Sequence, residues 1–134
     1  MESHKIEIRV RYQETDGQGI VHHANYLNYF EKARIEYLRS MGISYRDVEE
    51  AGLMLVVAEV ELRYFLPAYF DDLLQVETRV VSTKGAAIIH AYKITRDEEL
   101  LVQGTTRVGC LTNEGKVTRV PKWLGGRGGF PSPS

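Results

Sequence analysis

The sequence predicts an α+β domain in which a curled, mainly antiparallel sheet of five strands wraps around one long helix. One segment, residues 25–41, carries apolar side chains at spacings of three and four along its whole length. Five further segments alternate or run apolar over strand lengths. Nothing helical separates the last of them, so their connections read as hairpins and their pairing as antiparallel.

The first strand is predicted over residues 5–12, where Ile6, Ile8 and Val10 alternate with charged residues. The long helix follows at 25–41, with Asn25 as its N-cap and Gly42 just beyond its end. Its apolar stripe consists of Tyr26, Phe30, Ala33, Tyr37 and Met41, and Leu27 and Leu38 flank the stripe.

A short second helix is expected to begin where Ser44 and Asp47 form an approximate capping box, and to end at Gly52. The remaining strands are predicted over residues 53–65, 73–82, 86–96 and 100–112, and residues 117–120 extend the last one.

At 134 residues the chain forms one domain, expected over 1–124, and residues 125–134 have the composition of a disordered tail. A formal net charge of −1 excludes a chain-wide nucleic-acid footprint, and no apolar run is long enough for membrane insertion. The lone Cys110 cannot form an internal disulfide, and with no secretory signal at the N-terminus the expected location is cytoplasmic.

Residues 12–26 carry the chemistry. Asp16 stands in a polar loop shortly before the long helix, and Gly17 and Gly19 permit tight turning and close approach of a ligand. The free N–H groups at a helix start favour negative charge. A carboxylate and such an amide are the minimum for acyl transfer, although an aspartate in a Thr-Asp-Gly turn is more often structural on residue types alone.

The run over residues 15–26, Thr-Asp-Gly-Gln-Gly-Ile-Val-His-His-Ala-Asn-Tyr, resembles the signature of the 4-hydroxybenzoyl-CoA thioesterase-like hotdog family. It is most similar to the branch of small bacterial acyl-CoA thioesterases associated with the Tol-Pal envelope system. The offsets of Asp16, Gly19 and Tyr26 carry the resemblance, which extends from about residue 6 to residue 123 and covers the strand order. It implies the hotdog fold and an acyl-CoA thioesterase.

By this resemblance, Asp16 is the catalytic carboxylate, acting as nucleophile or as general base toward water. The backbone amide of His23 polarises the thioester carbonyl. The resemblance leaves acyl-CoA and acyl-carrier-protein thioesters open as substrates, and implies a homodimer or homotetramer whose sites are shared between copies. The residues it places around the substrate are Tyr12, Thr15, Gly19, Ile20, Val21 and Tyr26.

Two departures from the branch leave the acyl preference open: the pair Gly17 and Gln18, and His22 where relatives carry an aromatic residue. No metal or organic cofactor is expected, because a thioester is already activated, and adjacent histidines such as His22 and His23 rarely serve one metal ion. The rival functions are a non-catalytic acyl-thioester binding module and an acyl-thioester dehydratase; the position of Asp16 disfavours the second.

Other polar residues are interpreted as structural. His90 is predicted to be a satisfied histidine on the sheet, and Glu31 a helix-surface residue rather than a second acid. Some of four basic residues are candidates to contact the phosphates of coenzyme A, although most are expected to be surface charges: Arg63, Lys84, Arg96 and Arg107.

Overall fold

The computed structural model describes residues 3–124, and it has the predicted five strands and long helix. The elements are β1 (Ser3–Arg9), the 3-10 turn η1 (Tyr12–Glu14), α1 (Asn25–Ser40), α2 (Tyr45–Glu50), β2 (Leu53–Tyr64), β3 (Leu73–Lys84), β4 (Ala87–Arg96), β5 (Glu99–Thr112) and the 3-10 turn η2 (Lys122–Leu124). The predicted bounds differ from these by a few residues at most.

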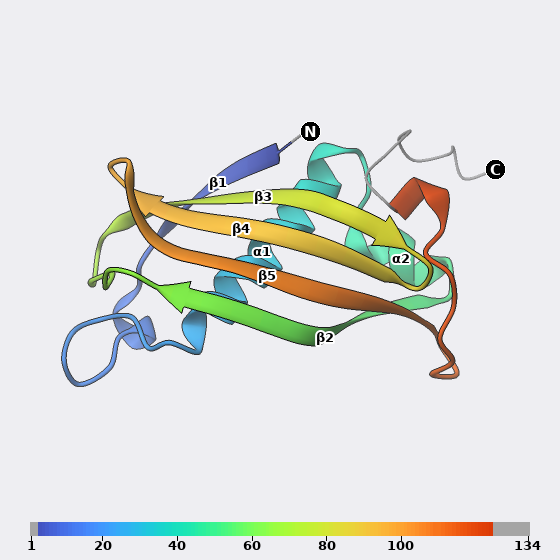
Figure 1. The fold of residues 1–134 in the computed structure, drawn as a ribbon, viewed down its shortest axis with the longest axis horizontal. Coiled ribbons are helices and arrows are strands. Elements are labelled where there is room, and N and C mark those ends of the chain that lie inside the picture. Colours follow the sequence, from blue (N-terminus) through green and yellow to red (C-terminus); the bar gives the residue numbers. More distant parts are fainter. Residues whose placement is uncertain (1–2, 125–134) are drawn as a thin grey trace.

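The five strands form one antiparallel sheet in the order β1-β3-β4-β5-β2, and α1 crosses one face of it (Figure 1). The hairpins β3–β4 and β4–β5 are as predicted. The strands β1 and β2 are the two edges, although β2 follows the helices directly in the chain. The loop between β1 and α1 lies at the end of the sheet where β2 ends (Figure 1).

Helix α1 buries one broad face against the sheet, as its periodicity predicts. The stripe differs from the predicted one by one residue at its start, because Tyr29 is buried and Leu27 is 41% exposed. At its other end Gly42 adopts φ +84, and the Ile43 N–H donates to the Leu38 carbonyl at 3.0 Å. This left-handed glycine ends the helix as the sequence predicts.

Strand β2 changes face in its middle. Its pairing with β5 shifts between Val57 and Glu59, so Ala58 is an extra residue. Leu55 and Val57 face α1 before the bulge, and Leu62 packs against the core on that side after it. A β-bulge moves the alternation by one residue. The acidic and basic residues that follow it consequently point to the outer face of the sheet.

Helix α1 packs tightly against the sheet at Gly104 on β5. A Cβ atom there would lie 2.8 Å from Leu62 Cδ2, 2.9 Å from the Glu61 carbonyl oxygen and 2.9 Å from Phe30 Cε2. Phe30 also stacks on Tyr92 at 4.0 Å between ring centroids. The absence of a side chain at this position allows α1 to approach the centre of the sheet.

Three expectations at the periphery have separate outcomes. The segment 117–120 contributes one isolated bridge, between Leu111 and Val117, rather than a longer β5. The tail 125–134 lies outside the described residues, so its predicted disorder stays a prediction. Within residues 3–124, no helix has the length and apolar character needed to cross a membrane.

Candidate active site

The loop that carries Asp16 is folded back on itself by short backbone bridges. Thr15 bridges to Val21, and Ile20 bridges to Tyr69 beyond β2. Gly19 adopts φ +80, and its N–H donates to the Asp16 carbonyl at 3.1 Å. Glycine adopts this left-handed conformation without the steric cost that a side chain brings. The loop is thereby closed into a compact turn beside the end of β2.

Glu14 fastens this loop to α1. Its carboxylate, 8% exposed at the residue level, accepts from the Arg11 N–H and from the Tyr29 hydroxyl, both at 2.9 Å. Its carbonyl oxygen accepts from the His22 N–H at 2.9 Å and from Asn25 Nδ2 at 2.8 Å. Burial, and next the hydrogen bond to Glu14, raise the pKa of Tyr29, so this phenol stays a donor. The sequence analysis missed Glu14, whose flanking loop reads as solvent-exposed.

The Asp16 side chain stabilises its own turn and also lines a cleft. Its Oδ1 accepts from the Gln18 N–H at 2.8 Å and from the Ile20 N–H at 3.4 Å. This is the side-chain turn typical of aspartate in loops. The same side chain lines a cleft. A structural role in the turn and a role in the cleft are therefore compatible, because the turn fixes the orientation of the carboxylate.

The segment before α1 contributes His23 to the same cleft. The His22 Nδ1 atom accepts from the Ala24 N–H at 3.2 Å, and the His23 carbonyl accepts from the Tyr64 hydroxyl at 3.4 Å. The His23 N–H has no hydrogen-bond partner among residues 3–124. The predicted N-cap at Asn25 is wrong: Asn25 is the first helical residue, and its side chain bonds to Glu14 instead.

The cleft has a volume of about 330 Å³ and is lined by two segments, residues 16–26 and residues 64–67. The loop contributes Asp16, Ile20, Val21 and His23, and α1 contributes Tyr26. The opposite wall, which the sequence analysis did not identify, is Tyr64, Phe65, Leu66 and Pro67. A sign of it was present in the sequence: apolar and aromatic residues continue past the end of β2 into a proline turn, where a solvated loop would be polar.

Two phenols frame the cleft. The rings of Tyr26 and Tyr64 lie 5.6 Å apart between centroids. Burial raises the pKa of each, so both hydroxyls are neutral donors at physiological pH. The lining of the cleft is mostly apolar, and Asp16 contributes its one carboxylate.

Three predicted residues do not line this cleft. Tyr12 is 76% exposed and packs edge-on against Phe70, with 5.6 Å between ring centroids. The Thr15 hydroxyl donates to the Tyr12 carbonyl at 2.7 Å. Gly19 shapes the turn without lining the cleft. These residues support the loop and lie outside the space that a ligand in this cleft would occupy.

A second cavity, of about 240 Å³, lies under the other half of α1, and His90 and Glu31 are among its lining residues. The prediction that His90 is satisfied is wrong, because its buried Nδ1 has no hydrogen-bond partner among residues 3–124. Burial, and next the nearby charge of Arg34, lower the pKa of His90 to about 3. The imidazole is therefore neutral, and it has no contact with Asp16.

The basic candidates occupy different surroundings. Arg96 is held by Asp72 at 2.8 Å and Glu99 at 3.0 Å, and it donates to the Pro67 carbonyl at 3.1 Å. It therefore braces the cleft wall and is not a free cation. Arg63 points away from the cleft, from the outer face of the sheet. Within residues 3–124, no group of three metal-binding side chains accompanies His22 and His23.

Comparison with known proteins identifies the same architecture elsewhere. The profile of the Thioesterase-like superfamily matches residues 10–127. The acyl-CoA thioesterase YbgC of Haemophilus influenzae is 41% identical over 105 residues, which cover 78% of this chain and 77% of that protein.

Two solved structures superpose closely. A protein of Aquifex aeolicus has a TM-score of 0.86 and 32% identity, covering 90% of this chain and 95% of its own. A structure described as a probable thioesterase from Bartonella henselae has a TM-score of 0.85 and 33% identity, covering 90% of this chain and 100% of its own.

Proposed function

This chain belongs to the Thioesterase-like superfamily of hotdog-fold proteins, and from that premise we propose how its cleft hydrolyses a thioester. The protein is an acyl-CoA thioester hydrolase. The family resemblance drawn from residues 15–26 is thus confirmed. What we add is an assignment of roles: Asp16 supplies the carboxylate, and the His23 amide stabilises the developing oxyanion.

One observation supports this assignment: the same mostly apolar cleft is lined by Asp16, whose carboxylate is held by its own turn, and by His23, whose backbone N–H has no partner among residues 3–124. The thioester carbonyl oxygen accepts from the His23 N–H, and α1, which begins two residues later, adds the positive end of its dipole. Negative charge that develops on this oxygen is stabilised by a donor that needs no rearrangement. The acyl group packs in the cleft against Tyr26, Tyr64 and Leu66.

Two routes are consistent with the position of Asp16. As general base, the carboxylate takes a proton from water, the resulting hydroxide adds to the carbonyl carbon, and the C–S bond breaks to release coenzyme A and the free acid. As nucleophile, a carboxylate oxygen adds to the carbonyl carbon and expels the thiolate. The mixed anhydride that results is then hydrolysed by water.

The test is turnover of a panel of short, long and aromatic acyl-CoA thioesters, and of acyl-carrier-protein thioesters, followed by release of free thiol. Asp16→Asn keeps an oxygen for the Gln18 and Ile20 amides, so the loop is expected to hold. Loss of the ionised carboxylate should lower kcat by about 100-fold or more.

Asp97→Asn is the matched control, because it makes the same chemical change in an exposed hairpin turn. We expect it to keep full activity. Turnover that is indifferent to a folded Asp16→Asn protein would refute the assignment of Asp16. Absence of turnover with the whole panel would instead favour a binding module that has retained the pocket.

We also propose that the working form is a homo-oligomer joined along β2. This strand is an edge of the sheet, paired on one side with β5. Beside this unpaired edge the strand carries exposed apolar residues, among them Val57, Val60 and Tyr64. An unpaired edge of this kind is a template for pairing with another strand. Because Tyr64 also lines the cleft, a second copy at this edge would cover the cleft opening.

A further inference from the structure

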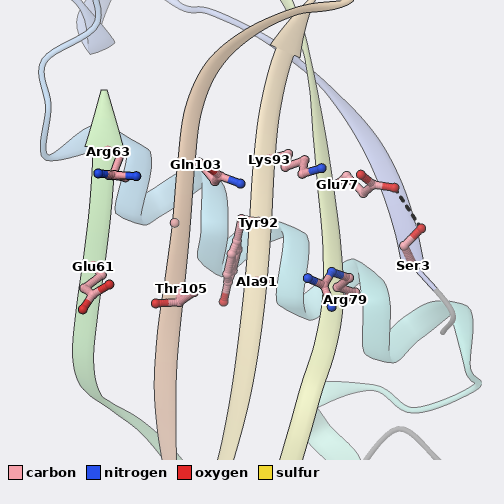
Figure 2. Close-up of a pocket in the computed structure, with 11 residues that line it drawn as sticks. Ser3, Glu61, Arg63, Glu77, Arg79, Ala91, Tyr92, Lys93, Gln103 and Thr105 are labelled. Atoms are coloured by element: carbon pink, nitrogen blue, oxygen red, sulfur yellow. Dashed lines mark hydrogen bonds between the residues drawn. The ribbon is translucent and has the colours of Figure 1, made fainter. Parts of the chain in front are cut away.

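The second cavity lies between α1 and the sheet, and the alternation of strand residues decides which side chains reach it. Successive residues of β4 face opposite sides of the sheet. Ala91 and Lys93 line a hollow on the outer face (Figure 2). Tyr92 stacks on Phe30 of α1, and His90 lines the cavity beneath the helix. The inner face of β4 therefore brings two polar aromatic side chains under α1.

Apolar side chains form most of the wall of this cavity. They come from α1 and from each of the strands β2 to β5, and include Ile35, Leu38, Leu55, Val80, Ile88 and Val108. The volume is about 240 Å³. An apolar cavity of roughly 150 Å³ is enough to hold a benzene molecule. The wall therefore fits the body of a small apolar molecule, either aromatic or aliphatic.

Arg34 brings an unmatched charge to this wall. The residue is half-buried, and its Nη1 donates to the Tyr92 hydroxyl at 3.1 Å. Among residues 3–124, no carboxylate lies within 4.0 Å of its guanidinium. Glu31 also lines the cavity, but it is exposed and forms no ion pair in the same part of the chain. Charges that are withdrawn from water are normally paired. The cavity thus carries a positive charge that residues 3–124 do not neutralise.

His90 lies close to this charge. Its ring centroid is 6.1 Å from that of Tyr92, whose hydroxyl accepts from Arg34. Burial, and next the Arg34 charge, lower the pKa of His90 to about 3, so the imidazole is neutral and carries one N–H. Its Nδ1 atom is enclosed without a partner among residues 3–124, and an enclosed N–H without an acceptor is rarer than an enclosed acceptor without a donor. The proton is therefore assigned to Nε2, which leaves this atom as the donor for a ligand.

We propose that this cavity binds a small carboxylic acid with an apolar body, whose carboxylate accepts hydrogen bonds from Arg34 and His90. A carboxylate supplies the negative charge that Arg34 lacks and the acceptor that the His90 N–H lacks. Hydrogen bonds between charged groups are shorter and stronger than those between neutral groups. A cationic ligand fits poorly beside Arg34, and a wholly apolar ligand would leave both polar side chains without a partner.

This site is separate from the Asp16 cleft within one chain, because the two cavities share no lining residue. The proposal does not depend on thioester hydrolysis, although the acid that such a reaction releases belongs to the same chemical class. A ligand that binds only the folded chain stabilises it. Binding of an acid between α1 and the sheet should therefore also raise the melting temperature.

The test is titration of the protein with benzoate and with hexanoate, followed by the methyl resonances of residues in the two cavities. We expect at least one acid to shift the signals of Ile88 and Val108, while Val21 and Leu66 of the Asp16 cleft keep theirs. Benzamide and hexanamide have nearly the same shapes without the charge. Each should bind at least about 10-fold more weakly than the corresponding acid.

Substitutions separate recognition of the carboxylate from packing around the apolar body. Arg34→Gln keeps a donor for the Tyr92 hydroxyl and should weaken acid binding at least about 10-fold, with amide binding unchanged. His90→Phe keeps a ring at this position but removes the N–H, and should weaken acid binding about 3-fold or more. Arg39→Gln is the matched control, because it makes the same change at an exposed position of α1. It should bind the acids as the wild type does.

Three outcomes would overturn the proposal. The first is an absence of shifts in the methyl groups of this cavity with both acids, or shifts confined to the Asp16 cleft. The second is equal binding of acids and amides. The third is full acid binding by folded Arg34→Gln or His90→Phe protein. Binding is measured here without turnover, so this result and the role of Asp16 are tested independently.

Discussion

At the scale of single residues, the site depends on side chains that hold backbone in place. Asp16 is oriented by the Gln18 and Ile20 amides of its own turn. Glu14 ties that turn to α1 through Tyr29 and Asn25. Buried acceptors of this kind are costly to remove, because each donor left behind loses its partner. The carboxylate that we propose reacts, Asp16, and the carboxylate that anchors the loop, Glu14, are thus two residues apart.

His90 gives the protein a pH-dependent stability. Because its pKa falls from 6.5 to about 3 on burial, the unfolded chain binds a proton between these values that the folded chain does not. This contribution is present above pH 6.5 and is lost as the pH falls, at up to about 1.4 kcal/mol per pH unit. We predict that between pH 7 and pH 5 the wild-type free energy of unfolding falls by about 2 kcal/mol more than that of His90→Gln.

Urea unfolding at the two pH values measures this difference. Titrating carboxylates shared by the two proteins change both stabilities alike and cancel in the comparison. Equal pH dependence in the two proteins would mean that His90 is charged, or solvated, in the native state.

At the scale of elements, one contact between α1 and the sheet joins apolar packing to hydrogen bonds. Phe30 lies over Gly104 and stacks on Tyr92, and the Tyr92 hydroxyl is hydrogen-bonded to Arg34 and Thr106. The apolar and polar contacts coincide there, so sliding of the helix along the sheet would break both.

We predict that Gly104→Ala destabilises the fold by about 1–3 kcal/mol, because its Cβ would overlap the Glu61 carbonyl and the Phe30 ring. Gly109→Ala is the control in the same strand. Its Cβ would meet the Val56 carbonyl at an ordinary 3.7 Å, so its effect should stay within about 0.5 kcal/mol. Denaturant midpoints compare the two. Equal stability of both variants would show that α1 tolerates displacement from the sheet.

At the scale of the whole molecule, the periodicity of apolar residues predicted the helix and the strands, because local sequence controls them. The strand alternation, the helix over 25–41 and the left-handed Gly42 follow from residue order alone, and the structure has them. The loop to which we assign the chemistry was predicted from the spacing of Asp16, Gly19 and Tyr26. The cleft wall at Tyr64 was not found, because it faces the loop only through the order of strands in the sheet. The bulge at Ala58, which decides the outward face of β2, leaves no periodic signal either.

The edge of the molecule supplies the prediction for the assembly. A charge placed on the edge strand β2 by Val60→Lys should oppose strand pairing and shift the protein toward single chains, with turnover falling in parallel. Val117→Lys makes the same change at a valine that is 74% exposed after β5, and it should alter neither property. Light scattering and thiol release together measure the outcome. A Val60→Lys protein of unchanged mass would locate the contact elsewhere.

The separation between the Gly104 contact and the cleft wall has a consequence for how related sequences can diverge. The cleft is lined by residues 64–67 and by Ile20, Val21 and His23, which lie outside the contact between Phe30, Tyr92 and Gly104. Drift in the wall can therefore retune which acyl group is accepted while the central packing is inherited unchanged. A lineage built on this arrangement can diversify its substrates without passing through unfolded intermediates, and Gly104 should vary less among its members than Phe65 or Leu66.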